Sequence, residues 1–394
     1  MTDTTETEPR SDWEPRSHPA PYTDYENLRR QCPVAYSDKH GGFWSLMRHA
    51  DVSKAARDWK SFRSGQPFVE FPDFTSAIPI TLNPPEHTAV RTLLNTYFRP
   101  DFLAPLEEKV RGYVDEHLGE LLSGGRGDAI TLAKPVPERT LAALLGMPDD
   151  TYLMFLEKHR RIFELAGDAE ATSKLLTHLW TDEVAALVDD RKAHPRDPRT
   201  DLMSGVLAAE IGGEPIPYES CVAIGVMLFA AGGETTTTAI TTSLHHLATH
   251  PEDQERLRAE PSLIPVAVEE FLRLNTPLHH LARRTTKDVT VGERTIPADS
   301  VVALNYASAN RDETVFPDAG TCVLDRTPNR HLAFGFGVHQ CVGAPVARME
   351  LHVALEAVLA RTASIELDGE PVEGTKANLA SGFASLPLKF TFPE

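Results

Sequence analysis

The sequence has few cysteines, and none of them belongs to a paired motif. Only four occur in 394 residues, and no two of them form a CxxC pair. This spacing excludes a disulfide framework and a zinc ribbon. It suits a reducing compartment, so we expect the protein to be cytoplasmic.

Basic residues are also scarce. The chain carries 39 lysines and arginines against 57 aspartates and glutamates, a net charge of −18. Such an acidic chain argues against nucleic acid as the main partner. Residues 1–20 are rich in Thr, Glu, Asp and Pro and contain no basic segment followed by an apolar one. We therefore expect no signal peptide and no membrane anchor, and we predict that residues 1–20 form a disordered tail.

The chain also lacks a linker, a repeat or a break in composition, so residues 21–394 are predicted to form a single domain. Apolar residues recur with a helical period over most of 85–192, 221–250, 251–259, 263–274 and 343–361. Short strands are predicted at 34–37, 42–47, 289–291 and 301–306. The expected fold class is mainly α with small β-sheets.

The longest apolar segment, residues 221–250, contains one acid, Glu234, and no lysine or arginine. By length it could span a membrane. Its cluster of glycines and threonines and its lack of a basic flank favour a central helix buried on nearly all sides. A buried Glu234 is costly unless it is paired, neutral or used in proton transfer, and Thr235 stands beside it. The alternative for Thr235 is a hydrogen bond back to its own helix.

Cys341 is isolated between glycines directly before the helix predicted at 343–361. Gly335, Gly337 and Gly343 permit backbone shapes and close approaches that a side chain would block. Unpaired amides and the positive end of the helix can hold a sulfur anion there. Cys341 is therefore a candidate ligand or nucleophile, and a buried structural thiol is the alternative.

Charged residues at helical spacing form two further groups. Glu270 and Arg273 stand at i and i+3 among apolar neighbours, which indicates a partly buried ion pair that needs a third partner such as Arg326. His87 and Arg91 stand at i and i+4 and point the same way. Solvated surface residues are the alternative for both groups. Four donors that could bind a pair of carboxylates are His87, Arg91, Arg283 and His339.

Together these segments resemble the cytochrome P450 family of haem-thiolate monooxygenases, in particular its soluble bacterial members. The resemblance rests on Phe334-x-x-Gly337-x-x-x-Cys341-x-Gly343, with Ala231-Gly-x-Glu-Thr235 and Glu270-x-x-Arg273 as support. It runs in the family's order from about Val34 to the C-terminus. It implies the cytochrome P450 fold, with a long central helix over the haem.

The resemblance implies haem b (iron protoporphyrin IX) as cofactor, with Cys341 as the axial thiolate on the iron. Phe334 would pack near the haem, and Gly337 and Gly343 would let the loop approach it. Glu234 and Thr235 would form the acid–alcohol pair that relays protons to bound dioxygen. The resemblance also assigns propionate contacts to His87, Arg91, Arg283 and His339, and a structural role to Glu270, Arg273 and Arg326.

By family position, the substrate pocket draws on a long apolar loop at residues 64–82 and on Met227, Ala230, His279 and Phe383. The resemblance implies that the enzyme uses O2 to oxidise its substrate. The lining indicates a small, mainly apolar organic molecule, one polar end of which His279 would orient. Plain core packing is the alternative for each of these residues.

No flavin or iron–sulfur segment is visible, so electrons must come from separate proteins. We predict a ferredoxin and a ferredoxin reductase that supply electrons from NAD(P)H. The cations expected to contact an acidic ferredoxin are Arg99, Lys109, Arg111 and Arg348. Other functions left open are a family member that uses peroxide or performs coupling or desaturation, and a non-catalytic haem sensor.

Overall fold

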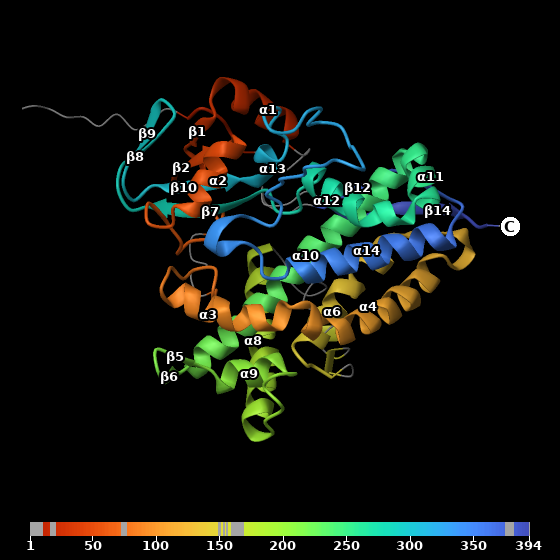
Figure 1. Ribbon diagram of the computed structural model, residues 1–394, viewed down its shortest axis with the longest axis horizontal. Helices are drawn as coiled ribbons and strands as arrows, with labels where there is room; N and C mark the ends of the chain where they lie inside the picture. Colours follow the sequence, from red (N-terminus) through yellow and green to blue (C-terminus); the bar gives the residue numbers. More distant parts are fainter. Residues whose placement is uncertain are drawn as a thin grey trace, which may run out of the picture. The chain divides into compact units, whose positions relative to one another are not determined.

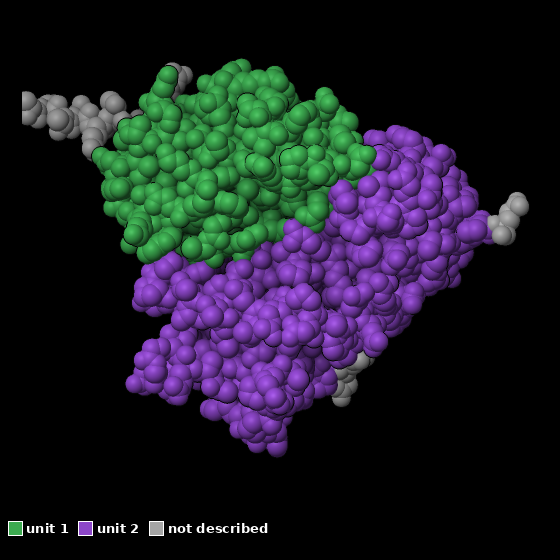
Figure 2. Space-filling view, in the orientation of Figure 1, with its two compact units in different colours: residues 1–75, 269–340, 375–381 green, residues 76–268, 341–374, 382–394 purple. Residues whose placement is uncertain are grey.

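A computed structural model describes residues 11–15, 21–71, 77–148, 151–152, 154, 157–158, 169–374 and 382–393. Figure 1 shows its helices and strands. Contacts divide the chain into two compact units, coloured in Figure 2. Unit 1 comprises residues 1–75, 269–340 and 375–381, and unit 2 comprises 76–268, 341–374 and 382–394. Each unit combines distant parts of the sequence, so the two units are not consecutive segments of the chain.

Unit 1 is built around a five-stranded sheet with the order β1-β2-β10-β7-β3. β10 runs parallel to β2 and antiparallel to β7, and β8 pairs with β9 in a separate hairpin. The elements of unit 1 are α1 (Tyr22–Gln31), β1 (Val34–Ser37), η1 (Lys39–Gly41), β2 (Phe43–Leu46), α2 (His49–Arg57), β3 (Phe62–Arg63), β7 (His280–Thr285), β8 (Val289–Val291), β9 (Arg294–Ile296), β10 (Val301–Asn305), α13 (Tyr306–Ala309) and η5 (Gly337–His339).

Unit 2 is mainly helical. Its elements are α3 (Glu86–Asn95), η2 (Thr96–Phe98), α4 (Pro100–Leu121), η3 (Ser123–Gly125), β4 (Arg126–Asp128), α5 (Ile130–Ala133), α6 (Pro135–Leu144), α8 (Ala169–Ala193), α9 (Leu202–Ala208), β5 (Glu210–Ile211), β6 (Glu214–Pro215), α10 (Tyr218–Thr249), α11 (Pro251–Ala259), η4 (Pro261–Leu263), α14 (Ala344–Arg361), β11 (Ser364–Leu367), β12 (Val372–Glu373), β13 (Phe383–Ser385) and β14 (Pro387–Thr391). α12 (Ile264–Leu274) starts in unit 2 and ends in unit 1.

The longest helix, α10, packs against α6, α8 and α14 within unit 2. It is the only helix among the described residues that is long and apolar enough to cross a membrane, and half of its most apolar 18-residue stretch is buried. Its C-terminal half is buried from Thr236 to Leu244, whereas Ala231 and Glu234 are exposed. The prediction that this helix is buried on nearly all sides is therefore wrong for its middle, because composition does not tell which face of a helix neighbours cover.

Gly232 of α10 allows α6 to approach. A Cβ atom at Gly232 would lie 2.7 Å from Cδ2 of Leu141 in α6, whereas one at Gly233 would meet only Glu138 Cγ at 3.7 Å. The first glycine is thus required by helix packing and the second is not.

Most of the predicted elements are present, but ten of the fourteen strands among the described residues were missed. β1 and β2 pair in register from Val34 with Leu46 to Ser37 with Phe43, as the predicted hairpin requires. The strands that were not predicted are β3 to β7, β9 and β11 to β14. Within residues 64–82, the described residues contain no helix or strand.

The predicted tail lies partly outside the described residues, at 1–10 and 16–20. Within residues 11–15, the Asp12 N–H donates to the carbonyl of Tyr36 in β1, and the Tyr36 N–H donates to the Asp12 carboxylate. Each of these hydrogen bonds is 2.8 Å long. The disordered tail and the single domain of residues 21–394 stay predictions.

Candidate functional site

Cys341 lies directly before α14. Its side chain is solvent-accessible, yet it sits deep among protein atoms, and this desolvation raises the pKa of the Cys341 thiol. The N–H groups of Gly343 and Ala344 and the positive charges of Arg91 and Arg348 lower that pKa in turn. An accessible sulfur with converging N–H groups and cations is suited to ligation as a thiolate.

Of the two glycines predicted to give clearance to the cysteine loop, residues 329–343, Gly337 has a steric reason within the chain. Its φ is +75°, and a Cβ atom there would lie 2.3 Å from the carbonyl oxygen of Ala56 in α2. At Gly343, a Cβ atom would meet Cys341 Sγ at an ordinary 3.8 Å. Only Gly337 is therefore required by packing among the described residues, and a role of either glycine beside a haem stays a prediction.

Two of the predicted propionate contacts are arginines that meet no carboxylate in the part of the chain that the structure describes. Arg283 is 3% exposed, and its Nη1 donates to the carbonyl of Ala282 at 2.7 Å. Arg91 donates from Nε to Asn95 Oδ1 at 2.8 Å. Burial lowers the pKa of both guanidinium groups, and neither meets a carboxylate among the described residues. A buried cation of this kind suits an anionic ligand group.

The two histidines predicted beside the propionates lie in different units. His87 is 1% exposed on α3, at the predicted helical spacing from Arg91. His339 belongs to η5, and its Nε2 lies 2.8 Å from Ser64 Oγ. Phe334, predicted to pack near the haem, is partly exposed.

Glu234 and Thr235 stand side by side in the middle of α10, and neither is fully buried. Glu234 is exposed, so the expectation of a buried acid is wrong. The Thr235 hydroxyl donates to the Ala231 carbonyl at 3.0 Å, the bond within its own helix that the alternative interpretation predicts. Their role in proton transfer stays a prediction.

The predicted contact of Glu270, Arg273 and Arg326 is present. Arg273 donates two hydrogen bonds of 2.7 Å to the two carboxylate oxygens of Glu270, and Arg326 Nε lies 3.0 Å from both. Both members of the Glu270–Arg273 pair have side chains that are 0% exposed. Burial alone would raise the pKa of Glu270, but Arg273, the Val323 amide and Arg326 together hold it below its usual value. Arg273 also donates to the carbonyls of Asn310 and Ala319, so the group anchors the chain between β10 and the cysteine loop.

Sequence reasoning missed a buried acid on α14. Glu350 is 2% exposed, its Oε1 has no hydrogen-bond partner, and burial raises the pKa of Glu350 to about 8. Interactions with the side chains of Thr140 on α6 and Thr236 on α10 lower this pKa in turn. The helical period could have revealed it, because residue 350 falls on the apolar face of residues 347, 351 and 354.

The four predicted substrate residues lie in varied surroundings. Met227 and Ala230 are partly exposed on α10. His279 is 1% exposed, with Nδ1 3.3 Å from the Tyr25 hydroxyl, and burial lowers the pKa of His279 to about 3. The ring of Phe383 packs on that of His245, with centroids 4.8 Å apart. Contacts of these four residues with a substrate stay predictions.

Two of the four cations predicted to contact a ferredoxin already form ion pairs within the chain. Arg99 pairs with Asp101 at 2.8 Å, and Arg111 pairs with Glu107 at 2.8 Å and with Glu356 at 2.9 Å. These pairs reduce the positive charge predicted to meet a ferredoxin. The other two predicted cations differ in exposure, since Lys109 is exposed and Arg348 partly buried.

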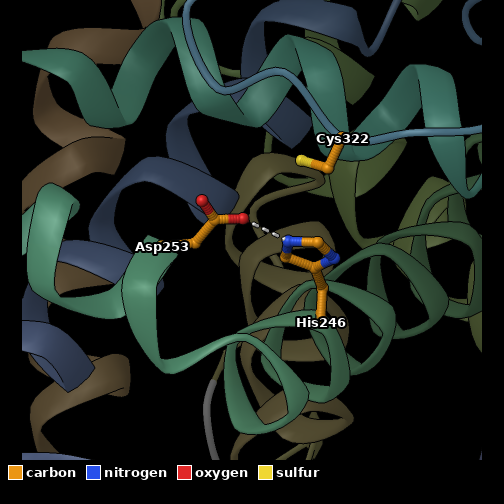
Figure 3. Close-up of side chains that lie close together, drawn as sticks. All are labelled: His246, Asp253 and Cys322. Carbon is orange, nitrogen blue, oxygen red and sulfur yellow. Dashed lines mark hydrogen bonds and ion pairs between the residues drawn. The ribbon is translucent and has the colours of Figure 1, made fainter. Parts of the chain in front are cut away.

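A histidine at the end of α10 has a structural partner in α11. His246 Nε2 lies 2.7 Å from Asp253 Oδ2, as Figure 3 shows. The His246 ring also stacks on that of His250, with centroids 4.0 Å apart. Burial lowers the pKa of His246, and Asp253 acts against this. The pair fixes the junction between the two helices.

Comparisons with known proteins agree with the site. The family model described as Cytochrome P450 matches residues 138–392. Cytochrome P450 130 of Mycobacterium tuberculosis is 34% identical over 390 residues, which cover 95% of this chain and 96% of the relative. The cyclomarin C epoxidase CymV of Salinispora arenicola is 31% identical, over 88% of this chain and 90% of the relative.

Solved structures extend the similarity to the fold. The substrate-free structure of CYP109E1 from Bacillus megaterium matches with a TM-score of 0.85 and 27% identity, over 95% of this chain and 99% of that one. CYP109Q5 from Chondromyces apiculatus matches with a TM-score of 0.83 and 31% identity, over 95% of this chain and 96% of that one. A further structure shows CYP109E1 in complex with corticosterone, with a TM-score of 0.83 and 26% identity, over 94% of this chain and 98% of that one.

Proposed function

This chain belongs to the cytochrome P450 family and is a P450 monooxygenase, and we propose that it inserts one oxygen atom from O2 into a C–H bond of a small, mainly apolar organic molecule. We further propose that a ferredoxin, reduced by NAD(P)H through a ferredoxin reductase, supplies the electrons in the cytoplasm. The observation that carries the proposal is the accessible Cys341 thiol beneath the amides of Gly343 and Ala344.

The residues of the chain fit haem b. Cys341 would bind the iron, and the adjacent amides and Arg91 favour its thiolate form. Arg91 is partly buried and Arg283 is buried, and a propionate would neutralise the positive charge of each. His87 and His339 would also act as propionate donors. When bound, the haem supplies the activation of dioxygen and the transfer of oxygen to the substrate.

The chain's own residues would deliver the protons. Glu234 is exposed and can exchange protons with solvent, and Thr235 is the next residue along α10. Thr235 can pass on a proton only when its hydroxyl turns away from the Ala231 carbonyl, to which it now donates. In this proposal Glu234 reloads Thr235 after each transfer.

The first experiment measures the Soret band of the ferrous carbon monoxide complex. We expect a thiolate-type band for the purified protein and its loss in Cys341→Ala. Cys221→Ala is the matched control, because Cys221 is a buried thiol in α10 that accounts for no such band. A thiolate-type band that persists in Cys341→Ala would overturn the proposal.

The second experiment measures product and peroxide per NADH consumed with surrogate redox partners. We expect Thr235→Ala to keep consuming oxygen but to divert it to peroxide, because the proton relay is broken. Unchanged coupling would contradict the assigned relay. Turnover with peroxide alone, or no product from any substrate, would instead favour a peroxide-using member or a sensor.

The substrate class can be narrowed by a binding screen. A relative has been solved with corticosterone bound, which supports an apolar organic ligand for this chain as well. We expect apolar compounds to displace the iron-bound water and change the spin state of the haem. A response confined to strongly polar compounds would contradict the proposed class.

A further inference from the structure

The start of the cysteine loop is held by three successive contacts within unit 1. Asn329 donates from Nδ2 to Glu270 Oε2 at 3.1 Å. His331 Nε2 lies 3.0 Å from Glu269 Oε2. The Leu332 N–H donates to Asn310 Oδ1 at 2.6 Å. Glu269 and Glu270 are adjacent residues of α12, so neighbouring acids on one helix hold neighbouring parts of the loop.

His331 differs from Asn329 and Leu332 because both nitrogens of its ring form hydrogen bonds. The Ala333 N–H donates to Nδ1 at 3.2 Å, so Nδ1 carries no proton. The proton is therefore on Nε2, which donates a hydrogen bond to Glu269. The side chain of His331 is 3% exposed, and these two bonds fix the orientation of its ring.

The ring of His331 also touches that of Phe334, with centroids 6.0 Å apart and planes inclined by 47°. The Gly335 N–H closes the same turn by donating to the Leu332 carbonyl at 2.9 Å. Gly337 follows two residues later and permits no side chain. The direction of Phe334, and of the chain that continues to Cys341, thus depends on the turn that His331 organises.

We propose that His331 is a positioning residue for the cysteine loop, which ties the loop to Glu269 of α12 through Nε2 and closes the turn that directs Phe334 through Nδ1. This inference rests on the proposed ligation of haem iron by Cys341. His331 itself touches neither substrate nor iron in this proposal. Its effect is to keep the loop in the one arrangement from which Cys341 reaches the metal.

Two conservative variants separate the functions of the two nitrogens. In His331→Asn, the side-chain oxygen replaces Nδ1 and can accept from the Ala333 N–H as in an Asx turn, but the contact with Glu269 is lost. In His331→Gln, the amide reaches Glu269, but the turn loses its acceptor. His331→Ala removes both. The matched control is His246→Gln, which alters another buried histidine paired with a carboxylate, away from this loop.

The first measurement is hydrogen exchange of the Ala333 amide in the haem-loaded protein. Loss of one hydrogen bond should speed exchange by about tenfold. We expect this in His331→Gln and His331→Ala but not in His331→Asn or His246→Gln. Wild-type exchange in His331→Ala would overturn the turn-closing role.

The second measurement is the rate at which the ferrous carbon monoxide complex loses its thiolate-type Soret band. We expect His331→Ala to lose it about tenfold faster than wild type, and Asn and Gln to fall between. Glu269→Ala should lose the band at the same rate as His331→Asn. The double variant Glu269→Ala/His331→Asn should lose it no faster than either single variant. Equal rates in wild type and His331→Ala would overturn the inference, whereas absence of the band from wild type would overturn the proposed ligation by Cys341 instead.

Discussion

Glu350 makes the stability of this protein depend on pH in a direction opposite to that of most acids. Burial raises the pKa of Glu350 from 4.5 to about 8. Between these values the folded chain keeps a proton that the unfolded chain has released, so stability falls as the pH rises. Each pH unit in this window costs about 1.4 kcal/mol. From about pH 6 to about pH 8.5 the free energy of unfolding therefore falls by about 3 kcal/mol because of this residue.

Glu350→Gln tests this reasoning, because the amide has nearly the shape of the acid and does not titrate. The assay is urea unfolding of the haem-loaded protein at both pH values, followed by far-ultraviolet circular dichroism. We expect wild type to lose about 3 kcal/mol more than Glu350→Gln between the two conditions. Glu108→Gln, at an exposed position of α4, should behave as wild type. Equal pH dependence in wild type and Glu350→Gln would refute the argument.

Three further substitutions, each compared with a control variant, test the packing around the site by urea unfolding. Gly337→Ala should destabilise by about 2 kcal/mol or more, because its Cβ would meet a backbone oxygen at 2.3 Å, whereas Gly320→Ala meets nothing within 4 Å and should be near neutral. Glu270→Gln should cost about 3–5 kcal/mol by leaving buried guanidinium groups uncompensated, against about 1 kcal/mol or less for Glu107→Gln in an exposed pair. Gly232→Ala should destabilise the wild type more than it destabilises a Leu141→Ala background, because the clash is with the Leu141 side chain. Gly233→Ala should stabilise by up to about 1 kcal/mol. The opposite order at the two neighbouring glycines would contradict the packing argument.

The sequence predicted best the elements whose ends carry a local signal. Pro251 occupies the first turn of α11, and Gly343 is the N-cap of α14, so both helices start within one residue of the predicted positions. β7 was missed because Arg283 and Arg284 follow one another in it and hide the alternation of a strand. Charged residues occur at these positions because of contacts with other parts of the fold. A local sequence pattern does not contain those contacts.

The same limit applies to the site. The spacing of Glu270 and Arg273 predicted their contact, because a helix brings residues three apart together whatever surrounds them. The exposure of Glu234 was misjudged from composition, and the burial of Glu350 was not predicted at all. Which side of α10 or α14 is covered depends on α4 and α6, whose approach is fixed by single residues such as Leu141.

The contact between Gly232 and Leu141 has a consequence for protein engineering. Libraries that diversify the central helix to change the choice of substrate would treat position 232 as one more variable site. Here it is coupled to position 141 on another helix, since the side chain of one residue occupies the space left by the other. Varying the two positions together would keep folded variants in the library that single-site diversification discards.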